Sequence, residues 1–358
     1  MTQTPAIVTT LKQPGPSLAS FLRYHLAIGF SRIFLFFDDP SDPYIEMARK
    51  FRHVRIIKND AHLRRKWKET RTALMNPWFY QFVDVELKVR QTLNVEIAIE
   101  FARRENIDWL LHIDCDELFY PSKGDAPAHF AAMSKRKLNN LIYANYEGLP
   151  EAVEIDDYFK RVTLFKKNVH LFPKQKLNAK HRRLIRQISQ LPEHLFLFYA
   201  NGKSAARVIA GLQPNGGHRF KYSDQNQSRS SAHRKTPILC KDAIILHYPC
   251  CGFKNFWRKY KMLGAFPDRW FDQVDVAKAI GSFHLESRDV ILRGSLREAR
   301  AFYKQRVVIK EKNLVNSLIH GGIVCRIDRP SELLIGGNQR LAINNRAKFA
   351  DPHPQISF

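Results

Sequence analysis

Short apolar runs alternate with segments of helical spacing through the first 120 residues of the chain. The apolar runs lie at 6–12, 31–37, 54–57 and 109–113. Between them, apolar residues recur every three or four positions at 17–28, 44–51 and 84–105. Such apolar runs are typical of buried strands, and strands separated by helices form βαβ units with a parallel sheet. The sequence therefore predicts an α/β fold, with a Rossmann-like, mostly parallel sheet flanked by helices.

The fourth apolar run ends in a cluster of carboxylates: Asp114, Asp116 and Glu117 lie within the stretch Trp109–Phe119. Residues two apart in a strand point to the same side, so Asp114 and Asp116 project together at the strand's carboxyl end, where open α/β sheets bind ligands. Adjacent carboxylates repel each other unless a cation lies between them, and Mn²⁺ or Mg²⁺ also bridges to phosphate oxygens. Such a pair in isolation is more often a solvated turn or a helix cap, but after a buried strand in a βαβ region it predicts a site for a divalent metal and a diphosphate.

Further residues with suitable chemistry follow other apolar runs. His247 ends the run at 243–248 and is a candidate third metal ligand, although a buried histidine bonded to backbone explains it nearly as well. Asp38 and Asp39 follow the second strand, where a carboxylate can bind ribose or a base edge; a simple turn before a helix is the alternative. His218 lies on a Gly-rich segment, where contact with phosphate or an acceptor is one interpretation and an ordinary loop histidine is the favoured one.

Basic and acidic side chains elsewhere complete the candidate site. Lys203, Arg207 and Lys259 are cations that can pair with a leaving diphosphate, although the P-loop pattern is absent. A transfer to an acceptor hydroxyl also needs a carboxylate as base. Glu147, which follows a predicted strand, is our first candidate, and Glu151 is the second.

The chain is strongly basic, with a net charge of +24, which predicts an anionic partner without choosing among nucleotides, glycans, lipids and nucleic acid. Its five cysteines form no CxxC pair, which fits a reducing compartment. No basic leader and no apolar run of the ~18–20 residues that a membrane span needs are visible. We therefore expect a cytoplasmic or peripheral membrane protein.

Beyond residue 121 the pattern is looser. It predicts strands at 141–144, 162–165, 196–199 and 243–248, helices at 253–263 and 285–307, and loops at 211–217 and 223–237. We expect a catalytic domain over 1–265, a helical extension over 266–328, and a turn-rich tail over 329–358.

Five stretches together resemble a known family. They are Phe21–Gly29 running into Phe36–Asp42, Arg90-Gln91, Trp109–Phe119, Gly202–Ser204, and Leu246–Tyr248 followed by Phe256, Lys259 and Gly264. They are similar to the glycosyltransferases of family 92 and their family-2-like relatives, which share the GT-A nucleotide-sugar fold. The stretches fall within residues 6–265, about three-quarters of the chain.

The resemblance implies a glycosyltransferase of the hexosyltransferase type. Asp114 and Asp116 match the family's DxD motif, which binds the divalent metal and the donor diphosphate. A UDP- or GDP-type donor, an inverting reaction, and a glycan, lipid or protein acceptor are the implied partners. The segment Tyr143–Glu151 departs from the family pattern, and no membrane anchor is visible. The donor-binding residues that we predict are Thr10, Asp38, Asp39, Gln91, Lys203, Arg207 and Lys259.

Two other functions remain open at this stage. A nucleotidyltransferase that makes nucleotide sugars would use the same sheet edge, but it normally has a Gly-rich loop and a basic residue after the first strand, which Leu11–Pro16 matches poorly. A basic protein that binds nucleic acid or an anionic membrane without catalysis explains the charge, but not carboxylates at two strand ends. We do not expect nucleic acid as the partner. Peripheral contact with an anionic membrane is compatible with an enzyme as well as with a non-catalytic binding protein.

Overall fold

The computed structural model describes residues 2–168, 179–189, 195–223, 237–270 and 274–344. The first elements are β1 (Pro5–Leu11), α1 (Leu18–Ala27), β2 (Arg32–Phe37), α2 (Tyr44–Ala48), β3 (Val54–Lys58), α3 (Ala61–Glu69), α4 (Arg71–Met75), α5 (Pro77–Tyr80), α6 (Leu87–Arg104), β4 (Trp109–His112), β5 (Glu117–Pro121) and α7 (Ala126–Lys135). The next are β6 (Asn140–Gly148), α8 (Tyr158–Arg161), β7 (Leu164–Lys166), α9 (Ala179–Ser189), β8 (Lys203–Arg207), β9 (Leu212–Pro214), β10 (Phe220–Tyr222) and β11 (Ile238–His247). The last are α10 (Phe253–Leu263), α11 (Val276–Ile280), α12 (Phe283–Arg293), α13 (Leu296–Arg306), α14 (Lys312–His320), β12 (Val324–Arg326) and α15 (Arg329–Asn344).

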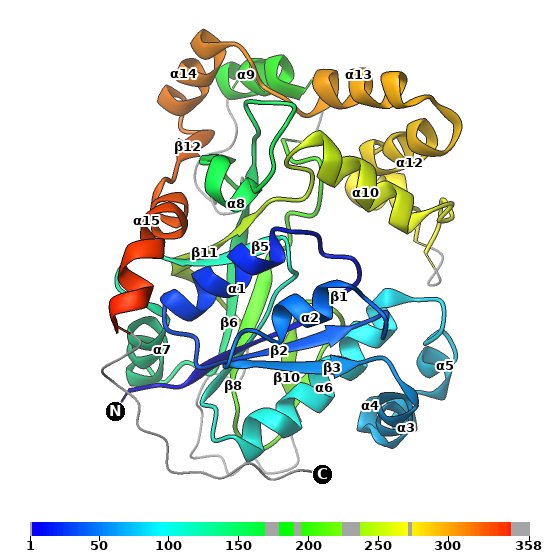
Figure 1. Cartoon of the computed structure of the whole chain (residues 1–358), viewed down its shortest axis with the longest axis vertical. Coiled ribbons are helices and arrows are strands. Elements are labelled where there is room, and N and C mark those ends of the chain that lie inside the picture. The colour runs from blue at the N-terminus through cyan, green and yellow to red at the C-terminus, as the bar shows by residue number, and fades with distance from the viewer. Residues whose placement is uncertain (1, 169–178, 190–194, 224–236, 271–273, 345–358) are drawn as a thin grey trace.

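One sheet of ten strands runs through the molecule in the order β12-β7-β6-β8-β4-β1-β2-β3, with β11 pairing with both β5 and β6 (Figure 1). Strands β4, β1, β2 and β3 are parallel neighbours, as are β6 and β11. The other pairs of this sheet are antiparallel. The predicted α/β fold is confirmed, and its parallel part is the βαβ region that the apolar runs predict.

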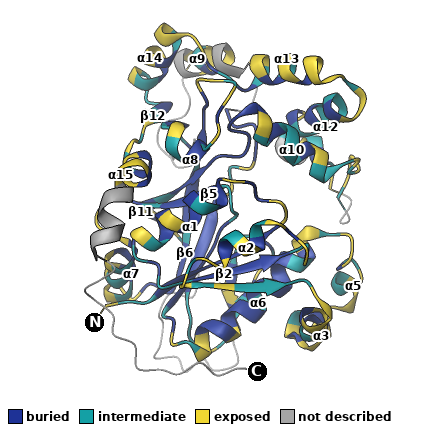
Figure 2. Cartoon of the chain, viewed as in Figure 1, coloured by how far each residue is buried: buried dark blue, intermediate teal, exposed yellow. Residues whose placement is uncertain are grey.

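Side chains alternate between two cores because successive strand residues point to opposite faces of the sheet. In β1, Ile7 and Leu11 join the core under α1, α2 and α7, whereas Ala6 and Val8 join the core under α3 and α6. All four are at most 3% exposed. Strands β1, β2 and β4 are buried almost throughout, whereas the edge strand β3 is only half-buried (Figure 2). Burial on both faces explains why the strands read as continuous apolar runs rather than alternating ones.

Helices α10, α12 and α13 form a separate aromatic cluster beyond the sheet (Figure 1). Phe256 and Tyr260 of α10 contact Phe283 of α12 and Tyr303 of α13 within a group of rings that also includes Phe198. The helix predicted over 253–263 is confirmed to the residue. This cluster fixes the orientation of α10, which faces the carboxyl end of β4.

Four expectations outside the parallel sheet differ from the structure. The helix expected over 285–307 is two helices, because Gly294 ends α12 and Ser295 starts α13 with a capping box. Residues 196–199 form no strand, because the amides of Leu197 and Phe198 donate to the Glu147 carboxylate instead. The loop expected at 211–217 contains β9, which pairs with β10. Residues from Arg329 form α15 rather than turns; the rest of that tail and most of 223–237 lie outside the described residues.

Candidate functional site

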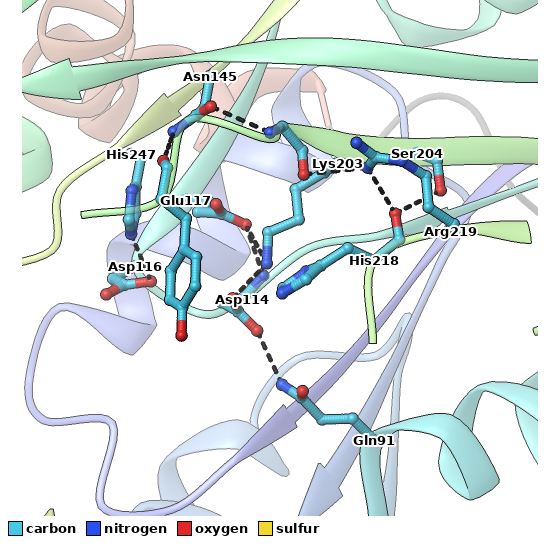
Figure 3. Close-up of polar contacts among 12 residues, drawn as sticks. Gln91, Asp114, Asp116, Glu117, Asn145, Lys203, Ser204, His218, Arg219 and His247 are labelled. Carbon is cyan, nitrogen blue, oxygen red and sulfur yellow. Dashed lines mark hydrogen bonds and ion pairs between the residues drawn. The ribbon is translucent and has the colours of Figure 1, made fainter. Parts of the chain in front are cut away.

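The candidate site lies where β4 ends and the chain bends through Asp114, Cys115 and Asp116 (Figure 3). Two backbone hydrogen bonds set the bend: the Glu117 amide donates to the Asp114 carbonyl over 3.1 Å, and the Tyr248 amide donates to the Asp116 carbonyl over 2.8 Å. The second bond ties the bend to the end of β11. The predicted location at the carboxyl edge of the parallel strands is therefore where these carboxylates lie.

Asp114 is held by two side chains from distant parts of the chain. The ammonium of Lys203, at the start of β8, pairs with Oδ2, and the Gln91 amide of α6 donates to Oδ1 over 3.1 Å. Burial raises the pKa of Asp114, but the ammonium of Lys203 lowers it, and the resulting pKa lies below the ordinary value. Asp114 is consequently ionised at neutral pH.

Lys203 also approaches a second carboxylate, because its ammonium lies 3.3 Å from Oε2 of Glu117. Both side chains are buried, at 6% and 2% exposure. Burial, together with the charges of Asp114 and Asp116, raises the pKa of Glu117 to about 8 despite Lys203. Burial lowers the pKa of Lys203, but the two carboxylates outweigh it and the net pKa is raised. One ammonium thus serves one ionised and one largely protonated carboxyl group.

Asp116 faces a different set of groups. Its Oδ2 accepts from the Lys259 ammonium of α10 over 3.4 Å, and its Oδ1 lies 3.8 Å from Nε2 of His247. Burial lowers the pKa of His247, so the imidazole is neutral at pH 7. Nδ1 of His247 is buried and has no hydrogen-bond partner. A neutral imidazole without a full set of partners, beside a carboxylate, offers a lone pair to a ligand.

These residues fit a divalent cation only in part. Asp116 and His247 are a carboxylate and a neutral imidazole on the same side of the site, whereas the Asp114 carboxylate is turned toward Lys203 and Gln91 (Figure 3). In the part of the chain that the structure describes, no group of three or more His, Cys, Asp and Glu side chains is arranged to hold a metal. A metal that also binds diphosphate oxygens needs only one or two protein ligands.

The position of Lys203 depends on Gly202 and on the residues that hold it. Gly202 has φ +66°, and a Cβ there would lie 2.1 Å from the Tyr143 carbonyl oxygen, so only glycine fits. The Asn145 side chain accepts from the Gly202 amide over 3.1 Å. Arg219 donates to the Gly202 carbonyl over 3.2 Å. The Gly202-Lys203-Ser204 stretch of the family resemblance was a usable signal, but Asn145 and Arg219 carried none.

His218 lies closer to the site than expected. Its ring stacks on His112, the last residue of β4, at 6.3 Å between centroids, and it points toward Asp114 (Figure 3). Burial lowers the pKa of His218 well below its usual value, and burial lowers that of His112 to about 4. Both rings are therefore neutral at pH 7 and add no positive charge to the site.

The predicted donor residues on the parallel strands are occupied by internal contacts. Asp38 forms a bidentate ion pair with Arg90, at 2.6 and 2.8 Å, and its side chain is 7% exposed. The Thr10 hydroxyl accepts from the Asn94 amide over 2.9 Å. Asp39 accepts from the hydroxyl and amide of Ser41, which lowers its pKa. All three residues lie at the carboxyl edge of β1 and β2, as the sequence predicts.

Arg207, Glu147 and Glu151 do not join this group. Arg207 pairs with Trp109, at the start of β4, because β8 runs antiparallel to β4 and carries residue 207 to the opposite edge of the sheet. Glu151 lies at the surface and pairs with Arg326. Glu147 is 1% exposed and pairs with Lys166. The base role predicted for the two glutamates stays a prediction.

Glu147 nevertheless contributes to the site indirectly, by positioning Phe198. Its two carboxylate oxygens accept from the amides of Leu197 and Phe198, each over 2.9 Å. The Phe198 ring packs edge-on against His247 and lies 4.7 Å from the Lys259 ammonium. Glu147 therefore positions a ring that contacts two of the groups around Asp116.

Two proteins of Arabidopsis thaliana are similar to this chain, and both are named glycosyltransferase-like. Each is 28% identical over 332 residues, covering 87% and 88% of this chain. The chain spans 67% of the length of the first relative and 60% of the second. No protein-family model matches the chain.

Similarity to solved structures is weaker. Core-mannan synthase A from Aspergillus fumigatus, in its Mn/GDP form, is 12% identical with a TM-score of 0.27 over 42% of this chain and 44% of its own. The galactosyltransferase LgtC is 11% identical with a TM-score of 0.26 over 83% of this chain and 99% of its own. At these scores the overlap carries no conclusion about the site.

Proposed function

We propose that the chain is a glycosyltransferase that moves a sugar from a nucleoside-diphosphate donor to an acceptor hydroxyl. The observation that carries this proposal is the convergence of Asp114 and Asp116 with Lys203, Lys259 and His247 at the carboxyl edge of a parallel sheet. The sequence similarity to two proteins named glycosyltransferase-like points the same way. Membership of family 92, and a DxD motif in that family's sense, stay predictions.

The lysines have different tasks in this proposal. The Lys203 side chain is 6% exposed and is committed to Asp114 and Glu117, so it holds the carboxylates in place. The Lys259 side chain is 28% exposed, so it is the more accessible of the two lysines to a ligand. As the bond to the sugar breaks, negative charge grows on the leaving diphosphate, and a fixed cation stabilises that charge. Lys259 is the residue that we assign to this contact.

A divalent cation, Mn²⁺ or Mg²⁺, belongs to the proposal as an expected partner of Asp116 and His247. When bound, such an ion supplies Lewis-acid stabilisation of the departing diphosphate. Asp116 offers the carboxylate and His247 the neutral imidazole, and Asp114 keeps Lys203 in place beside them. Among the residues that the structure describes, this pair has the best donor chemistry for the ion, although it is not a three-ligand site.

The rest of the reaction stays at the level of prediction. Thr10 and Asp39 lie at the edge where the nucleoside would bind, whereas Asp38 holds Arg90 and so shapes that edge indirectly. A UDP- or GDP-type donor, inversion at the anomeric carbon, and a glycan, lipid or protein acceptor are the expectations that follow from the family resemblance. None of the described helices combines the length and apolarity that crossing a bilayer requires.

A thermal-shift and transfer assay tests the proposal. UDP- and GDP-sugars with Mn²⁺ are screened for a rise in melting temperature, because a ligand that binds only the folded state must stabilise it. Lys259→Met removes a charged contact worth about 1.5–3 kcal/mol, so donor affinity falls about tenfold or more. Lys261→Met, on the same helix, is the matched control, since Lys261 contacts the Trp257 ring instead.

The results divide cleanly between functions. Donor-dependent stabilisation, sugar transfer or donor hydrolysis that Lys259→Met reduces and Lys261→Met preserves supports the proposal. Equal donor binding by both variants contradicts the role of Lys259. Release of pyrophosphate from a nucleoside triphosphate and a sugar phosphate would show that the protein is a nucleotidyltransferase and not a glycosyltransferase.

A further inference from the structure

A group of apolar side chains is exposed on the surface between α4 and the start of α6. Leu74 is 66% exposed, Met75 74%, Trp78 56%, Val85 75% and Leu87 42%. We call these five residues the apolar patch. Helix α4 contacts α3, α5 and α6, so the patch belongs to one packed unit at the periphery of the molecule (Figures 1 and 2). Large apolar side chains that are exposed together on one small packed unit are the kind of surface that marks an interaction site.

The exposure is fixed by the structure around it. The Thr70 side chain accepts from the Ala73 amide at the start of α4, and the Asn76 side chain accepts from the Phe79 amide at the start of α5. The Glu96 carboxylate of α6 accepts from the amides of Arg71 and Thr72. Helices of five and four residues are not stable alone, so these contacts hold the patch outward.

Basic side chains border the patch. Residues 61–88 contain six Lys and Arg against three Asp and Glu, and Arg64 pairs with Asp84 over 2.6 Å. Arg65, Lys68 and Lys88 are exposed. Exposed apolar side chains that include a tryptophan, with exposed lysine and arginine in the same segment, combine insertion among lipid chains with attraction to anionic headgroups.

We propose that the apolar patch and its basic border dock this protein on the surface of an anionic lipid bilayer. A second copy of the chain is a poor occupant, because two molecules that each carry a net charge of +24 repel each other. A bilayer instead accepts the apolar side chains and attracts the charges around them. A chain that lies on the surface in this way needs no spanning helix.

The patch is close to the candidate site along α6. Leu87 begins this helix, and Gln91, one turn later, donates to Asp114 over 3.1 Å. Lys88 and Gln91 are also the side chains nearest to Gly217. A docked bilayer would therefore lie beside the site, and this favours an acceptor that is itself in the membrane. The inference about the acceptor rests on the proposed function, whereas the docking does not.

Vesicle co-sedimentation of the full chain tests the docking. Wild type is mixed with vesicles of phosphatidylcholine alone and with vesicles that also contain phosphatidylserine. The double variant Met75→Ser/Trp78→Ser removes apolar surface, and Leu296→Ser, at a residue 58% exposed on α13, is the matched control. Lys68→Gln tests the border, with Lys135→Gln on α7 as its control.

We expect strong binding to anionic vesicles only, weakened about tenfold or more by the double variant and unchanged by Leu296→Ser. Vesicles should also shield Trp78 from an aqueous fluorescence quencher, a signal that Trp78→Phe abolishes in an otherwise folded protein. Binding of the double variant equal to wild type, failure of wild type to bind, or a patch-dependent shift in oligomeric state without vesicle binding would overturn the proposal. Sugar transfer to a soluble acceptor is measured in parallel, so that loss of docking and loss of activity are seen separately.

Discussion

The buried lysine beside the acidic motif gives a quantitative test of how the site is built. In Lys203→Met a flexible apolar chain of similar length replaces the ammonium that contacts both Asp114 and Glu117. Removing one partner of a buried ion pair costs about 3–5 kcal/mol, because the remaining charge is left without compensation. Because the pKa of Glu117 is raised to about 8, Glu117 is largely protonated below that pH and then leaves no unpaired charge. The loss should therefore be larger at pH 9 than at pH 6.

Urea unfolding of wild type, Lys203→Met, Asp114→Asn and the double variant measures this cost. Because Lys203 and Asp114 contact each other, we expect the two losses to overlap, with a coupling free energy of about 1–3 kcal/mol. Lys221→Met, at an exposed position of β10, is the control and should change stability by less than about 0.5 kcal/mol. A Lys203→Met cost below about 1 kcal/mol, or additive losses, would refute the assignment of a buried ion pair.

Three further predictions concern the pH dependence of stability, the backbone at Gly202 and the ion pair of Glu147. Burial lowers the pKa of His25 to about 3 and that of His112 to about 4, so the unfolded chain binds more protons below pH 6.5. Each histidine then removes about 1.4 kcal/mol of stability per pH unit as the pH falls from 6.5 toward its folded pKa. A pH series of urea unfolding measures this slope. A free energy of unfolding that stays constant from pH 6 to 4.5 would contradict the lowered pKa values. Gly202→Ala forces the backbone away from the Tyr143 carbonyl, which displaces Lys203. We expect calorimetric titration to show weaker donor binding, and thermal unfolding to show only a small fall in melting temperature. Glu147→Gln loses the ion pair with Lys166 and should destabilise the fold by about 3 kcal/mol; an unchanged melting temperature with abolished turnover would instead favour a base role.

Local pattern was sufficient to predict the part of the site that comes from contiguous chain. The strand that ends at His112, the carboxylates after it and the bounds of α10 follow from apolar spacing, because both faces of the sheet are covered and each helix has one apolar side. The same reasoning places Thr10 and Asp38 at the correct edge. It could not assign Asp38 to Arg90, whose side chain comes from a helix 52 residues away.

What sequence alone could not give is the direction and pairing of distant strands. Arg207 was grouped with Lys203, but β8 is antiparallel to β4 and separates the two residues along its length. The strand expected at 196–199 failed because a side chain, Glu147, takes hydrogen bonds that a neighbouring strand would otherwise provide. Asn145 and Arg219 hold Gly202 through contacts that no local pattern records.

Binding of a nucleotide-sugar diphosphate at Asp116 is the central requirement of the proposed function. Calorimetric titration of UDP- and GDP-sugars, with Mn²⁺ and with a chelator, compares wild type with Asp116→Asn and with Asp242→Asn, a surface carboxylate that pairs with Arg136. We predict Mn²⁺-dependent binding that Asp116→Asn weakens about tenfold or more and Asp242→Asn leaves intact. Donor binding by Asp116→Asn that equals wild type in the presence of Mn²⁺ would contradict the central claim.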